Sequence, residues 1–146
     1  ARLRRRLSPP WLRKWGMPAN ETTAFDAVGG ADAVRALIDR FYDLMDLEPA
    51  YAGIRALHPS TLDGSRDKLN MFLSGWLGGP DLYQQRFGHP RLRAKHLPYA
   101  IGIAERDQWM ACMQQAMREC ELDAVLQERL TAAFANTADW MRNKGG

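Results

Sequence analysis

Apolar residues recur at the spacing of an amphipathic helix in four stretches of the chain, and no stretch keeps the alternation that is typical of a strand. The first stretch begins at Ala31, and the others cover about 65–77, 105–120 and 123–142. Ser65 is placed to cap the second helix. The apolar positions that define the four stretches are Val34, Leu37, Ile38, Phe41, Leu44 and Met45; Leu69, Phe72, Leu73 and Trp76; Trp109, Cys112, Met113, Ala116 and Met117; and Leu126, Leu130, Ala133, Phe134, Thr137 and Met141.

Glycine and proline separate these helices. Gly78-Gly79-Pro80 ends the second one, because glycine terminates helices well and proline cannot continue them. The mixed stretch over residues 51–64 is interpreted as a bend. A segment broken by Gly88-His89-Pro90 leads to a short turn that carries His96. Four long helices and one short one predict an all-α fold.

Composition narrows the class of protein. At 146 residues the chain predicts one domain with a single core. It has no run of about 18 apolar residues and no signal-peptide pattern, so we expect a cytoplasmic protein without a transmembrane segment. Cys112 and Cys120 would lie ~12 Å apart along one helix, beyond the reach of a disulfide. Neither belongs to a C-x-x-C pattern, which argues against zinc-ribbon, thioredoxin and covalent haem-attachment sites.

Charge is unevenly distributed along the chain. The formal net charge is +3, but residues 1–16 carry six of the 20 Lys and Arg and no acidic residue. The remaining 14 cations face 17 acidic residues, a net charge of −3. We therefore expect residues 1–23 to form a basic, poorly ordered N-terminal extension and 24–146 to form the folded domain. Trp11 and Trp15 lie among the basic residues, a pattern that can contact anionic lipid or nucleic acid. We nevertheless expect no nucleic-acid partner for the protein.

His96 is the residue on which a functional interpretation depends. It lies between Leu92, Leu97 and Tyr99, just before Pro98, and a histidine with apolar neighbours suits the axial position of a flat apolar cofactor. A hydrogen-bonded structural histidine is the alternative on residue type alone.

Five segments in order decide between these alternatives, because together they resemble the group II truncated haemoglobins. The resemblance runs from about Phe25 to about Met141, and the tryptophan at 109 points to group II. The segments are Phe25-Asp26-Ala27-Val28-Gly29-Gly30, Arg40-Phe41-Tyr42, Met71-Phe72-Leu73 with the Gly-Gly-Pro stop, Gly88-His89-Pro90-Arg91-Leu92-Arg93, and Glu105-Arg106-Asp107-Gln108-Trp109-Met110-Ala111-Cys112-Met113.

The resemblance implies a two-on-two α-helical sandwich around a non-covalently held haem b, with His96 as the proximal ligand of the iron. It places Tyr42 and Trp109 as hydrogen-bond donors to the bound ligand. His58 would either donate to the ligand or bind the iron itself. The other residues that the resemblance places around the haem are Phe41, Ser65, Leu69, Phe72, Leu73, Tyr99 and, as partners of the propionates, Arg91, Arg93 and Lys95.

The function that follows from this resemblance is reversible binding of O₂, CO and NO, with slow release caused by distal hydrogen bonds. The alternative is a haem enzyme with peroxidase-like or NO-detoxifying activity. Because no G-x-G-x-x-G motif is present, an NO-detoxifying enzyme would need a separate reductase. A ligand sensor and a homodimer stay open. His89 is interpreted as a structural turn residue, in preference to a zinc site built from His58, His89 and His96.

Overall fold

The structure is a computed structural model, and it describes residues 23–91 and 101–142. Residues 1–22 of the expected extension and four residues of the expected haem site, Arg93, Lys95, His96 and Tyr99, lie outside this part of the chain.

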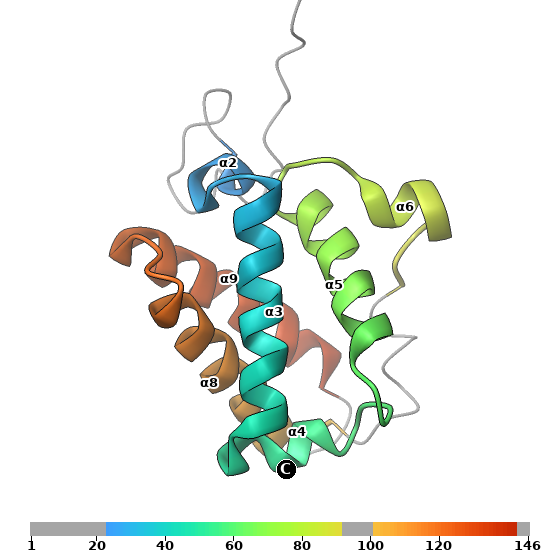
Figure 1. Cartoon of the computed structure of the whole chain (residues 1–146), viewed down its shortest axis with the longest axis vertical. Coiled ribbons are helices and arrows are strands. Elements are labelled where there is room, and N and C mark those ends of the chain that lie inside the picture. Colours follow the sequence, from blue (N-terminus) through green and yellow to red (C-terminus); the bar gives the residue numbers. More distant parts are fainter. Residues whose placement is uncertain (1–22, 92–100, 143–146) are drawn as a thin grey trace, which may run out of the picture.

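Four long helices form the body of the molecule: α3 (Ala31–Leu47), α5 (Asp63–Trp76), α8 (Ile103–Glu119) and α9 (Ala124–Met141). In Figure 1, α3 runs through the centre, α5 lies on one side of it and α8 on the other, and α9 passes behind α3. Helix α3 packs against both α5 and α8, and α8 packs against α9. The described part of the chain contains no strand, which confirms the all-α prediction. None of its helices is long and apolar enough to cross a membrane.

Short helices lie between and before the long ones, partly in segments where we expected a bend or a loop. They are α2 (Ala24–Val28), the 3₁₀ turn η1 (Pro49–Tyr51), α4 (Ala52–Arg55) and α6 (Leu82–Phe87). Elements of three to six residues complete at most two turns, which is too little for hydrophobic periodicity to reveal them.

The predicted starts of two long helices were late. Helix α5 begins at Asp63, where the Thr61 hydroxyl accepts a hydrogen bond from the Asp63 N–H at 3.3 Å, so Ser65 lies in the first turn and does not cap it. Helix α8 begins at Ile103, because the Gly102 N–H donates to the Glu105 carboxylate at 2.7 Å. A glutamate three residues into a helix satisfies the backbone in this way, so it belongs inside the helix rather than at its start.

The core confirms the predicted apolar face of the first long helix. All six of its defining residues are buried, and Phe41, Val34 and Ile38 are fully inaccessible. They face Cys112, Met113, Ala116 and Met117 of α8, which are also fully inaccessible. The six buried residues of this helix are Val34, Leu37, Ile38, Phe41, Leu44 and Met45.

Both cysteines are free, which confirms that they form no disulfide. The Cys112 thiol donates to the Phe41 carbonyl across the α3–α8 contact at 3.2 Å. Burial raises the pKa of this thiol to about 12, so it remains protonated and acts as part of the packing.

Residues of α2 pack closely against the glycines that follow α5. The Phe25 N–H donates to the Leu77 carbonyl at 2.8 Å, and the Phe25 ring lies so close to Gly79 that a Cβ there would come within 2.5 Å of it. Two motifs that are 50 residues apart in sequence therefore depend on each other, since only glycine permits this approach.

Candidate functional site

Two of the residues expected at the distal side of a haem contact one buried ring, and the third contacts one of these two. The Phe41 ring is 5.0 Å from the Tyr42 ring and 5.2 Å from the Trp109 ring, centroid to centroid. Tyr42 contacts His58 edge-on at 5.8 Å. Helix α3, helix α8 and the turn after α4 thus meet at linked ring contacts, although the residues that they contribute come from positions as far apart as 41 and 109.

Phe134 of α9 extends this group of rings and links Trp109 of α8 to Trp76 of α5. The Phe134 ring is 5.5 Å from Trp109 and stacks on Trp76 of α5 at 4.9 Å, with 13° between the planes. Sequence reasoning assigned Phe134 only to the apolar face of its helix. No sequence signal distinguishes it from its neighbours, because its importance comes from a contact with a helix elsewhere in the chain.

Tyr42 and Trp109 both carry a donor that no described residue satisfies. Tyr42 is only 5% exposed, yet within residues 23–91 and 101–142 neither its hydroxyl nor the Trp109 indole N–H has a hydrogen-bond partner. Burial raises the pKa of Tyr42, an effect that the nearby Arg66 charge only partly offsets, so the phenol remains a donor. Neither donor atom is among the buried side-chain atoms without a partner in the described residues, so both remain accessible. Two accessible donors beside one buried ring suit a polar ligand that accepts hydrogen bonds.

His58 is held in one tautomer by the backbone. Its Nδ1 lies 2.8 Å from the Ile54 carbonyl, which can only accept, so Nδ1 carries the proton. The Ile54 N–H in turn donates to Gln108 Oε1 at 3.1 Å. Gly53 makes room for this, since a Cβ there would lie 2.7 Å from the Gln108 amide. In its neutral form, His58 therefore carries no proton on Nε2, and it donates from Nε2 only when the ring is protonated.

Several apolar side chains that pack against the core are only partly buried. They include Leu69, Phe72 and Trp76 on α5 and Trp109 and Met110 on α8. Leu73, by contrast, is 2% exposed and packs into the core. Ser65 lies one turn before Leu69, on the first turn of α5. Large apolar surfaces beside a few polar donors form the lining that a flat apolar cofactor with a small polar ligand requires.

At the end of α6, His89 has the structural role that we expected. Its Nδ1 accepts a hydrogen bond from the Arg91 N–H at 3.0 Å, which confirms it as a turn histidine. Arg91, whose N–H makes this hydrogen bond, is exposed and has a positive φ of 48°.

A family model and several known proteins match this chain over nearly all of its described part. The model of the bacterial-like globin family matches residues 23–143. The group 2 truncated haemoglobin YjbI of Bacillus subtilis is 35% identical over 120 residues, which cover 82% of this chain and 88% of that protein. The chain belongs to the group II truncated haemoglobins. As in that family, this haemoglobin is a haem protein that reversibly binds gaseous ligands such as O₂.

Solved structures show that the fold of this haemoglobin is the two-on-two globin fold. The group II 2-on-2 haemoglobin from Agrobacterium tumefaciens superposes with a TM-score of 0.81 at 44% identity, over 87% of this chain and 98% of that one. The cold-adapted truncated haemoglobin from Pseudoalteromonas haloplanktis gives a TM-score of 0.82 at 38% identity, over 84% and 99%. The pairs α3–α5 and α8–α9 are therefore the two layers of the sandwich.

Proposed function

We propose that this haemoglobin holds haem b non-covalently through His96 and releases O₂ slowly. The motif around His96 supports the proximal role, and the absence of a C-x-x-C-H sequence supports non-covalent attachment. When bound, the haem supplies the iron at which O₂, CO or NO is held. Leu69, Phe72 and Tyr99 would contact its apolar faces, and Arg91, Arg93 and Lys95 would pair with its propionates.

The observation that carries the proposal is the pair of accessible donors on Tyr42 and Trp109, which form no hydrogen bond with the described residues. Each is held in place by Phe41, so neither side chain needs to be ordered when a ligand arrives. A net hydrogen bond is worth about 1 kcal/mol, and more when the acceptor is charged, as in a ligand that withdraws electron density. At ~1.4 kcal/mol for each bond to a charged acceptor, two bonds slow release by about a hundredfold, since ~1.4 kcal/mol corresponds to a factor of ten.

The proposal also covers the cellular location of the protein, its domain boundaries and its source of electrons. The two free cysteines are consistent with a reducing cytoplasmic location. Residues 24–146 would form the globin domain and residues 1–23 a basic extension. Any turnover of the bound ligand would draw electrons from a separate reductase, because the sequence has no dinucleotide-binding motif. Sedimentation at several concentrations tests whether two copies of the chain associate.

The experiment that tests the haem site compares two histidines in the same segment. His96→Ala should lose the Soret absorption band or release haem during gel filtration, because it removes the iron ligand. His89→Ala is the matched control, since His89 only supports a turn, and it should keep one haem per chain. Retention of a normal ferrous haem spectrum in His96→Ala would overturn the assignment.

A further inference from the structure

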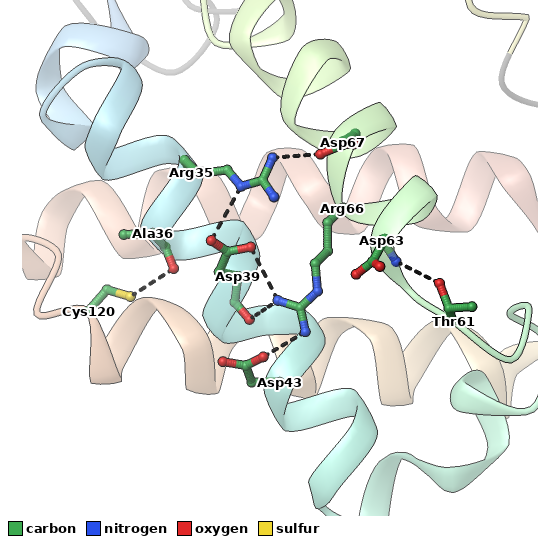
Figure 2. Close-up of polar contacts among 9 residues, drawn as sticks. All are labelled: Arg35, Ala36, Asp39, Asp43, Thr61, Asp63, Arg66, Asp67 and Cys120. Atoms are coloured by element: carbon green, nitrogen blue, oxygen red, sulfur yellow. Dashed lines mark hydrogen bonds and ion pairs between the residues drawn. The ribbon is translucent and has the colours of Figure 1, made fainter.

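Charged side chains on α3 and α5 converge on the ring of Tyr42. Arg66 of α5 reaches across to α3, where its Nη1 donates to the Asp39 backbone carbonyl at 3.0 Å and to the Asp39 carboxylate at 3.2 Å. Its Nη2 donates to the Asp43 carboxylate at 2.6 Å. Figure 2 shows this fork, with Asp39 and Asp43 one turn apart on the same face of α3.

The same guanidinium lies over the Tyr42 ring, 5.9 Å from its centroid. Arginine stacks on aromatic faces because its planar charge is weakly hydrated, and the attraction grows as water is removed. The Arg66 side chain is only 17% exposed, so it is less accessible than that of Arg35, at 40%. Asp39 and Asp43 thus fix a cation against one face of the ring while Phe41 contacts it edge-on.

We propose that Arg66 is a positioning residue for Tyr42, which sets the direction of its hydroxyl toward the bound ligand by clamping the ring between α5 and α3. This inference rests on the proposed function, because it assigns Tyr42 a donor role. Arg66 touches neither cofactor nor ligand in this account. It acts through the ring, whose hydroxyl has no other described partner to hold it in place.

Arg35 offers a matched control on the same two helices. It also joins α3 to α5, through the Asp67 carboxylate at 2.9 Å, and it pairs with Asp39 on its own helix at 3.3 Å (Figure 2). Among the described residues, the cation over the Tyr42 ring is Arg66 and not Arg35. Losing either arginine removes an ion-paired cation between these helices. Only the loss of Arg66 removes the clamp.

The test is a double-mutant cycle on the O₂ dissociation rate of the haem-loaded protein. Arg66→Met should raise the rate by about threefold to tenfold, whereas Arg35→Met should change it less than twofold. In a Tyr42→Phe background, Arg66→Met should add less than twofold, because the hydroxyl that it directs is gone. The C–O stretching frequency of the CO complex should shift in Arg66→Met and stay unchanged in Arg35→Met.

The outcomes distinguish a failure of the proposed function from a failure of the positioning role alone. If Tyr42→Phe alone leaves the rate unchanged, the donor role of Tyr42 in the proposed function fails, and this inference fails with it. If Tyr42→Phe raises the rate but Arg66→Met does not, or raises it equally in the Phe background, only the positioning role is overturned. Should Arg66→Met lose haem, Asp43→Asn replaces it, since it weakens the clamp at constant size. It should raise the rate at least twofold, and a smaller change would overturn the positioning role.

Discussion

The two sides of α3 are held to their neighbours by different chemistry. Toward α8 the contact is apolar and sealed, with Leu37, Phe41 and Met113 at most 1% exposed. Toward α5, ion pairs of Arg35 and Arg66 span the helices, and their side chains keep 40% and 17% of their accessible surface. Tyr42 lies on the border between these two regions, next to Phe41 in sequence and under Arg66 in space.

The difference indicates that the two contacts of α3 serve different purposes, one for stability and one for the orientation of a side chain. Burial of large apolar side chains supplies most of the folding free energy, so the α3–α8 contact should set stability. Exposed ion pairs contribute little to stability, but they fix direction, which matters where a single hydroxyl must be oriented. We therefore expect substitutions on the α8 side to change unfolding, and substitutions on the α5 side to change ligand kinetics.

The largest effect should come from removing apolar volume on the α8 side. Leu37→Ala should lower the free energy of unfolding by about 2–5 kcal/mol, because it leaves a cavity in a fully buried region. Arg35→Met, on the same helix, should change it by less than about 1 kcal/mol, since its ion pairs are exposed. Urea unfolding measures both, and equal losses would remove the distinction between the two contacts.

A smaller effect should appear at alkaline pH, through Tyr42. Burial raises the native pKa of this phenol, whereas in the unfolded chain it ionises near pH ~10. The stability that it contributes is complete below that pH, and it is lost as the pH rises toward the native pKa. The free energy of unfolding should fall by up to ~1.4 kcal/mol per pH unit above pH ~10 from this group. Tyr42→Phe should reduce that slope in urea unfolding at pH 9, 10 and 11, and an unchanged slope would contradict the burial argument.

Much of the fold could be predicted from the sequence because the long helices are strongly periodic. All six apolar positions of the stretch from Ala31 proved buried, and the stop after Trp76 fell where the glycines and proline placed it. What could not be predicted was set by single polar contacts. The Thr61 hydroxyl and the Glu105 carboxylate each shift the start of a helix by two residues, and such contacts have no periodic signal.

The candidate site could be predicted only as a set of residue types. The resemblance supplied Tyr42, His58 and Trp109, which the structure brings together, but it gave no reason to choose Phe134, Gln108 or Arg66. Those three act on the first group through contacts between helices. Asp39 and Asp43, four residues apart, did offer a signal for a cation on that face of α3, although they could not identify which arginine it would be.

The central claim is that Trp109 and Tyr42 donate hydrogen bonds to the bound ligand, and the O₂ dissociation rate tests it most directly. Stopped-flow displacement of O₂ by CO should give a rate at least tenfold higher in Trp109→Leu than in the unchanged protein, which corresponds to ~1.4 kcal/mol or more. The Tyr42→Phe/Trp109→Leu double variant should release O₂ faster still. Rates within twofold of the unchanged protein in both variants, with haem content intact, would show that these side chains only pack and would contradict the account.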